Sequence, residues 1–207
     1  MPSSIVSSID RVVSSAIDKY NDILQSEHVS KNIIIDGKES RGQVEEKKKQ
    51  ITTEDEYTRT CTCMLDTPVK RGSFIQIENN DKTGYDLGIV KSVPNKTPVD
   101  YYFTVLLFNT TAKRYRKQFI YSPDGYVVGD NPLVEDEIPC FVSRVGTRQR
   151  QIDVGIDSNA VNQIITSKIW DIQRNDILHI GSERYKITDL RELDKEICEG
   201  YMTFYRE

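Results

Sequence analysis

Four cysteines and two histidines are the side chains of this 207-residue chain best suited to bind a metal or attack a substrate. Cys61 and Cys63 are separated by one residue, whereas paired zinc ligands usually follow a C-x₂₋₄-C spacing. They lie in an alternating stretch that predicts a β-strand, in which both thiols face the same side. His28 and His179 flank no such pair. The spacing therefore predicts buried, reduced thiols, with no metal site and no disulfide.

Catalytic motifs are missing from the sequence. It contains no P-loop, no Gly-rich dinucleotide fingerprint, no G-x-S-x-G elbow and no HExxH. Two histidines leave few candidates for general acid–base catalysis. Asp and Glu are plentiful, but most of them fall in polar turns, where a solvated charge is expected. The sequence predicts a protein that is not an enzyme and has no catalytic residues and no cofactor; a hydrolase with convergent carboxylates is the alternative.

Basic residues interleaved with aromatics form the last candidate site. The segment 113–117 reads Lys-Arg-Tyr-Arg-Lys, and strand alternation places Arg114 and Arg116 on one face. Arg148 and Arg150 form a second basic cluster. Small barrels bind single-stranded nucleic acid through such strands, so these four arginines are candidate partner-binding residues. The alternative is a solvated hairpin whose charges pair with acidic neighbours or guard a sheet edge.

Composition limits the class of protein. The chain is 37% hydrophobic and 29% charged, as in ordinary globular proteins of one large or two modest domains. Its formal net charge of -4 disfavours general binding to duplex DNA, which depends on neutralising phosphates. Apolar runs fall far short of the roughly 20 residues that cross a bilayer, and no signal peptide is evident. We expect no membrane partner and synthesis in a cytoplasm.

An N-terminal amphipathic helix is predicted within residues 1–30, most clearly from Ser3 to Leu24. On a helical projection its apolar side chains fall within about 140° of arc. Ile9, Val12, Val13 and Ile17 lie at the centre of this arc and are candidate partner-binding residues. Two interpretations are open: the arc covers the chain's own barrel, or it docks on a neighbouring subunit or a partner's groove.

Short β-strands separated by Gly, Pro and Asn follow the helix, among them predicted strands at Phe74 to Glu78 and Ile177 to Ile180. We predict a first β-barrel unit at 31–122, an acidic linker at 123–138 and a second β-barrel unit at 139–207. The polar segment 37–53 is expected to be a mobile loop or a protruding hairpin. The expected fold is mainly β, with tandem small β-barrel units and one N-terminal amphipathic α-helix.

The two β series resemble each other, which indicates an internal duplication. Residues 69–77 align with 172–180, and 58–64 with 161–167, at one constant offset. Beyond a turn of different length, 85–90 align with 184–189 and 102–105 with 201–204. Upstream, Ile33-Ile34-Ile35 is matched to Phe141-Val142. We therefore predict that both units have the same strand order.

Residues 173–189, which read QRNDILHIGSERYKITD, resemble the small β-barrel of tailed-bacteriophage head-closure or head-tail joining (neck connector) proteins. The shared pattern is a polar turn, a short strand, a hairpin with Gly, and a Tyr-containing strand that ends near Asp. The resemblance covers the C-terminal part of the chain, and the first unit only through the repeat. It implies a structural virion protein without catalytic residues.

The resemblance implies a neck component that forms a homo-oligomeric ring between portal and tail and helps to close the DNA-filled head. Its expected partners are the portal or adaptor protein and tail proteins, with genomic DNA passing through without sequence-specific binding. The expected location is the virion, and the host cytoplasm during assembly. Two units and a leading helix depart from the simplest members. A tail-completion or baseplate component, or a single-stranded nucleic-acid-binding small barrel, is therefore the alternative.

Overall fold

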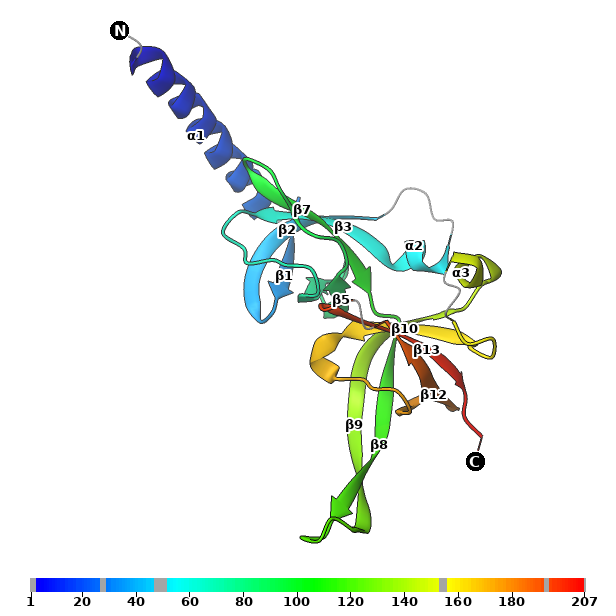
Figure 1. The fold of residues 1–207 in the computed structure, drawn as a ribbon. Helices are drawn as coiled ribbons and strands as arrows, with labels where there is room; N and C mark the ends of the chain where they lie inside the picture. Colours follow the sequence, from blue (N-terminus) through cyan, green and yellow to red (C-terminus); the bar gives the residue numbers. More distant parts are fainter. Residues whose placement is uncertain (1–2, 27–28, 47–51, 153–155, 192–193, 207) are drawn as a thin grey trace. The chain divides into compact units, whose positions relative to one another are not determined.

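The computed structural model describes residues 3–26, 29–46, 52–152, 156–191 and 194–206. The chain divides into two compact units, Met1–Leu106 and Leu107–Glu207. Each unit is built on a closed antiparallel β-barrel of six strands (Figure 1). The predicted fold class is confirmed: mainly β, with tandem small barrels and an N-terminal helix.

The described residues of the first unit form two helices and seven strands, which are α1 (Ser3–Gln25), β1 (Lys31–Ile35), β2 (Lys38–Glu46), α2 (Thr53–Tyr57), β3 (Thr58–Met64), β4 (Phe74–Glu78), β5 (Tyr85–Val90), β6 (Asn95–Lys96) and β7 (Asp100–Leu107). Its barrel runs β3-β2-β1-β4-β5-β7 and closes where β7 pairs with β3, while the short β6 adds to β7. Alternate residues of these strands are buried and form the core, among them Ile33, Ile35, Cys61, Cys63, Ile75, Ile77, Phe103 and Val105.

In the second unit, the part that the structure describes forms six strands, one α-helix and one 3₁₀ helix, which are β8 (Thr110–Tyr121), β9 (Val127–Arg144), α3 (Thr147–Ile152), β10 (Asn162–Ser167), η1 (Lys168–Trp170), β11 (Ile177–Ile180), β12 (Glu183–Leu190) and β13 (Ile197–Phe204). Its barrel closes in the order β10-β13-β12-β11-β8-β9. The tight turn at Gly181, where φ is +60°, joins β11 to β12 as the sequence predicts. Its core includes Ala112, Cys140, Ile164, Leu178, Ile187 and Met202.

The predicted unit boundaries are wrong. β8, assigned to 31–122, pairs with β9 and β11 and so belongs to the second barrel. The supposed acidic linker at 123–138 is largely the first half of β9, paired with β8 from Val127 onward. In the part of this half whose side chains the structure describes, Val127 and Val128 are 54% and 65% exposed. Burial therefore leaves no alternating pattern at its start.

The expected loop at 37–53 is also wrong over residues 38–46, and residues 47–51 lie outside the described residues. β2 occupies 38–46 and pairs with both β1 and β3. Its one fully buried residue is Gly42, and Val44 on the same face is only half-buried, so the strand has no row of buried hydrophobic side chains to signal it. The remaining residues of β2 are mostly polar, and a polar sequence without a buried hydrophobic row predicts a loop.

The prediction that both units have the same strand order is confirmed. When β1, β2, β3, β4, β5 and β7 are replaced by β8, β9, β10, β11, β12 and β13, the order of the first barrel becomes that of the second. One detail is corrected, because Ile33-Ile34-Ile35 in β1 is equivalent to part of β8 and not to Phe141-Val142 in β9. β1 pairs with β4, and β8 pairs in the same way with β11. Each of these partner strands follows a polar turn, at 70–73 in the first unit and 173–176 in the second.

The turn before β4 and β11 repeats the same backbone hydrogen bonds. Gly72 and Asn175 both have positive φ, at +82° and +72°. The N–H of Gly72 donates to the carbonyl of Val90 over 2.8 Å, and that of Asn175 donates to the carbonyl of Ile187 over 2.9 Å. These bonds make Val90 equivalent to Ile187. The sequence alignment of 85–90 with 184–189 instead places Val90 opposite Asp189, two residues further along the chain.

The side chain that closes this turn also occupies the same place in both units. The N–H of Lys70 donates to Ser73 Oγ over 3.3 Å, and the N–H of Gln173 donates to Asp176 Oδ2 over 2.8 Å. Both acceptor residues are 1% exposed. The duplication has therefore kept the geometry of the turn while changing a hydroxyl into a carboxylate.

Candidate functional site

The apolar arc of α1 remains largely open on this chain. Val12 is 70% exposed, Val13 47% and Ile23 53%, while Ile17 is half-buried. The side chain of Ile9 lies outside the described residues. An amphipathic helix whose apolar face is exposed to this degree is typical of a surface that another element covers.

The C-terminal end of α1 is attached to the first barrel. Leu24 is 1% exposed, and the Tyr20 hydroxyl donates to Asp100 Oδ2 over 2.6 Å. Desolvation by burial and this hydrogen bond raise the pKa of Tyr20 to about 12, so the hydroxyl keeps its proton at neutral pH. The helix is thus held at its end and leaves its central turns accessible.

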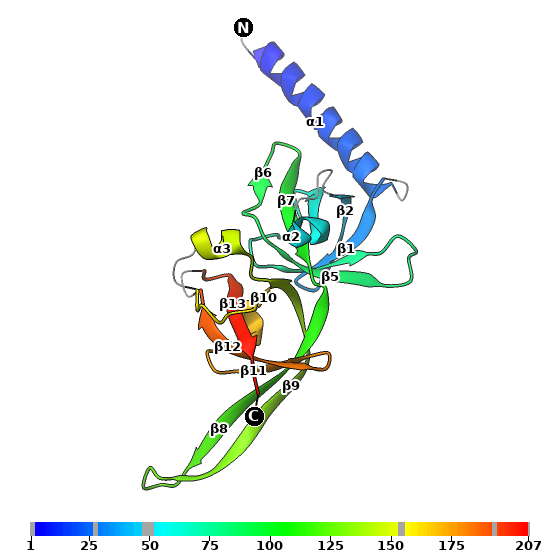
Figure 2. The ribbon, with the colours of Figure 1, turned by 90° about the vertical axis from the view of Figure 1, so that its right-hand side faces the viewer.

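The distal part of the β8–β9 hairpin is the second exposed apolar surface. β11 pairs with β8 as far as Tyr115, and β10 pairs with β9 only from Phe141 to Arg144. The hairpin extends past these strands (Figures 1 and 2). Six large apolar side chains at its tip are 50–74% exposed: Phe119, Ile120, Tyr121, Tyr126, Val127 and Val128.

Sequence reasoning missed this tip, although a signal was present. Residues 119–121 and 126–128 are two runs of three apolar residues on either side of Ser122-Pro123-Asp124-Gly125. Strict alternation would have indicated one buried face, whereas unbroken triplets beside a turn indicate a hairpin that is apolar on both faces. We call residues 119–128 the hairpin tip.

Arg114 lies inside the second unit and is bonded there, not on the exposed face that the prediction expects. It is 3% exposed, and its guanidinium donates to the carbonyls of Trp170 and Asp171 at the end of η1. The last carbonyls of a helix lack intrahelical donors, and Arg114 supplies them. Desolvation by burial, followed by repulsion from Arg116, lowers the pKa of Arg114.

Arg116 is likewise used inside the second unit. It binds the carboxylate of Asp176 in a bidentate manner, with Nε–Oδ1 at 2.6 Å and Nη2–Oδ2 at 2.7 Å, and it also contacts Asp171 at 3.2 Å. The hydrogen bond to Asp176 is the main cause of a raised Arg116 pKa. Because its side chain is 17% exposed, little of it faces solvent.

The second basic cluster shows a similar pattern. The guanidinium of Arg150 donates to the carbonyls of Asp157, Ser158 and Ala160 and so ties α3 to the following loop. The side chain of Arg148 lies outside the described residues. The three predicted arginines whose side chains are described, Arg114, Arg116 and Arg150, therefore bind acceptors of their own unit and do not form one basic surface.

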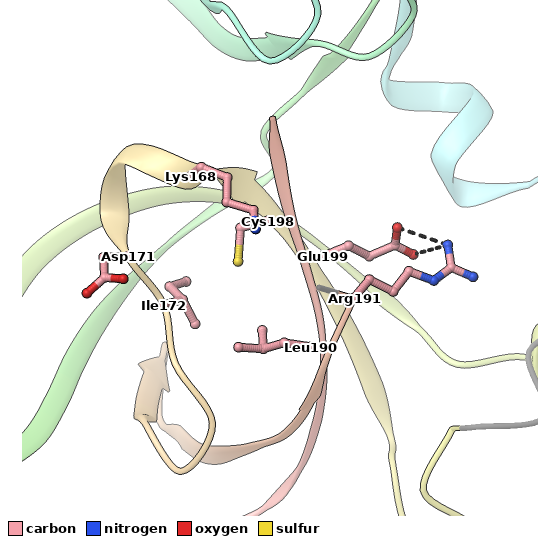
Figure 3. Close-up of a pocket in the computed structure, with 7 residues that line it drawn as sticks. All are labelled: Lys168, Asp171, Ile172, Leu190, Arg191, Cys198 and Glu199. Atoms are coloured by element: carbon pink, nitrogen blue, oxygen red, sulfur yellow. Dashed lines mark hydrogen bonds and ion pairs between the residues drawn. The ribbon is translucent and has the colours of Figure 1, made fainter. Parts of the chain in front are cut away.

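A small pocket in the second unit is lined by Lys168, Asp171, Ile172, Leu190, Arg191, Cys198 and Glu199 (Figure 3). Arg191 and Glu199 form an ion pair at its wall, with both N–O distances at 3.0 Å. Burial raises the pKa of Cys198 to about 11, so its thiol is protonated at neutral pH. Since the thiolate is the nucleophile and the metal ligand, this pocket presents a neutral thiol of low reactivity.

We expect all four cysteines to resist alkylation in the folded protein. Burial raises the pKa of Cys61, Cys63 and Cys140 to about 12, and all four thiols are free and buried. Iodoacetamide at pH 8 should add no label to the native chain and four labels after unfolding, as measured by intact mass. Adding a thiol reductant should leave the melting temperature unchanged. Rapid labelling of the native protein would contradict this arrangement.

The described residues contain no metal-binding cluster and no membrane-spanning helix. Within these residues, no three or more His, Cys, Asp or Glu side chains are grouped so that they could hold a metal ion. Among the described helices, none is both long and apolar enough to span a membrane.

No known family model matches this chain, and no curated protein matches it. Two crystal structures of MrkH from K. pneumonia do match. The apo state is 7% identical over 93% of this chain and 84% of that chain, with a TM-score of 0.23. The P2(1) crystal at 2.65 Å is 8% identical over 94% and 85%, with the same TM-score. At this TM-score the similarity carries no argument about fold or function.

Proposed function

We propose that this chain is a non-enzymatic assembly protein, and specifically a neck component of a tailed bacteriophage that forms a ring between portal and tail. The observation that carries the assembly role is the exposed apolar arc of α1, where Val12 and Val13 are 70% and 47% exposed. The resemblance of residues 173–189 to neck connector barrels supports the phage assignment.

Assembly proteins act by presenting surfaces, and a specific interface takes about 800 Å² from each partner. A 23-residue helix fixed at its C-terminal end supplies such a surface without disturbing the barrel it is attached to. The interpretation in which the arc covers the chain's own barrel fits only its last two turns, where Leu24 is buried. The central turns are available to a neighbouring subunit or to the portal.

The single-stranded nucleic-acid alternative is less well supported. It relies on Arg114, Arg116, Arg148 and Arg150, and three of these donate to acceptors of their own unit. Phosphate binding needs cations that are free to replace condensed counterions.

The test is the mass of the assembly and its dependence on α1. Size-exclusion chromatography with light scattering should show an oligomer, alone or after mixing with the portal ring encoded by the same phage. Val12→Asp with Val13→Asp should abolish this assembly, because the interface would bury two charges. Its melting temperature should stay within a few degrees of the parent's, since both side chains are exposed in the single chain.

The matched control is Ser14→Asp with Ser15→Asp, which adds the same charge to the polar side of the same helix. This control should assemble normally. Assembly that survives the valine changes would refute the proposed role of α1. A large loss of thermal stability in the valine variant would instead show that the arc packs on its own barrel. A chain that stays monomeric under all these conditions would refute the ring.

A further inference from the structure

The distal β8–β9 hairpin has two free edges. In the described part of the chain, no strand pairs with the outer edge of β8 from Arg116 to Tyr121, or with that of β9 from Val127 to Asn131. Backbone N–H and C=O groups along such edges are ready to bind another strand. Pro132, which has no N–H, ends the uninterrupted stretch of β9.

In residues 119–121 and 126–128 these edges contain neither a charged residue nor a proline. Proteins commonly guard an edge with charges, prolines or covering elements. Here the side chains beside the edges are the large apolar residues of the hairpin tip, each 50–74% exposed. Pairing with another strand would place a neighbour about 4.8 Å away and cover these side chains as well as the backbone.

The two strands carry opposite charge in their sequences. Within the segments whose edges are free, β8 contains Arg116 and Lys117 and no acidic residue, and β9 contains Asp130 and no basic residue. Arg116 is already bound to Asp176, so Lys117 and Asp130 carry the difference. Opposite charges on facing strands are stabilising and like charges are destabilising. Charge complementarity therefore favours β8 of one copy beside β9 of another over two like strands.

We propose that copies of this chain associate through their hairpins, with residues 116–121 of β8 in one copy paired antiparallel to residues 127–131 of β9 in the next. The unlike edges make this contact heterologous, so each copy binds two neighbours. Such contacts close into a ring when the rotation between copies allows it. The ring of the proposed function would then contain a continuous β-structure made of one hairpin from each subunit.

Disulfide trapping on the full chain tests this pairing. The β8 variants Ile120→Cys and Tyr121→Cys are each mixed with the β9 variants Val127→Cys and Val128→Cys, one partner carrying a mass tag. The four mixtures cover neighbouring registers. Mild oxidation should give a disulfide-linked heterodimer in at least one mixture, whereas each variant alone should remain uncrosslinked. The parent chain is the control, because its own four cysteines are buried.

Light scattering on the parent chain gives its oligomeric state, which separates the other possible outcomes. Homodimers formed by single variants alone would show that like edges meet and would overturn the proposal. A parent oligomer without any hairpin crosslink would place the contact elsewhere, which refutes this inference and leaves the proposed function intact. A monomeric parent without crosslinks would refute both.

Discussion

Replacing Asp176 with Asn is expected to lower the free energy of unfolding of the second unit by about 3 kcal/mol. The carboxylate is 1% exposed and accepts hydrogen bonds from Nε and Nη2 of Arg116 and from the N–H of Gln173. Without the negative charge, the guanidinium of Arg116, itself 17% exposed, loses its principal counter-charge. A largely buried charge that loses its counter-charge is one of the few causes of a large destabilisation by a single substitution.

Urea unfolding followed by tryptophan fluorescence is the appropriate measurement. Trp170 is the single tryptophan of the chain and lies in the second unit, so its signal reports on this barrel. The matched control is Asp171→Asn, which removes another carboxylate bound to Arg116, but one whose side chain is 70% exposed. The control should cost less than about 1 kcal/mol, as surface ion pairs do. Equal losses in the two variants would rule out a special role for the buried pair.

Gly42→Ala is expected to destabilise the first unit by about 2–3 kcal/mol, because overpacking costs this much where the backbone cannot yield. A Cβ at this position would lie 2.7 Å from the carbonyl oxygen of Thr62 and 3.0 Å from Cδ1 of Ile33. Gly42 is flanked by β1 and β3 through its pairing with Lys31 and Cys63. Strands held on both sides leave little room for the main chain to move.

The control for this change is Gly84→Ala in the same unit, where the nearest atom to a new Cβ is Nδ2 of Asn79 at 3.6 Å. That variant should unfold within about 0.5 kcal/mol of the parent, as neutral surface changes do. Urea unfolding followed by far-ultraviolet circular dichroism measures both. If Gly42→Ala unfolds like the control, the close contact between β2 and β3 is wrong.

The sequence predicted those elements whose burial leaves a periodic signal. Phe74–Glu78 and Ile177–Ile180 match the predicted strands residue for residue, since alternate side chains of each enter a core. The helix over Ser3–Gln25 was predicted from its amphipathic pattern in the same way. β2 and the distal half of β9 escaped prediction because neither contributes a row of buried side chains. The duplication was visible because the polar turn before β4 and β11 retains a similar sequence.

The candidate site was less predictable than the fold. The exposure of Val12 and Val13 agrees with the apolar arc read from the sequence. Arg114 and Arg116 do not form an exposed basic surface. Strand alternation predicts that they share a face of the strand, but it does not predict whether that face points into or out of the barrel. Arg114 occupies an inward position, where carbonyls at the end of η1 satisfy its charge. The carbonyls at the end of η1 lie more than 50 residues from Arg114 in the sequence. A local sequence pattern therefore could not predict this contact.

The arm formed by β8 and β9 is an enlarged version of the β1–β2 hairpin of the first unit. Its strands have 12 and 18 residues, against 5 and 9 in β1 and β2. The barrel uses only three residues of β8 to bind β11 and four of β9 to bind β10. Adding or removing two residues in each strand would change the reach of the arm by about 7 Å and preserve which side chains share a face. Selection can therefore adjust this length in discrete steps, fitting the molecule to neighbours of different size while the barrel stays unaltered.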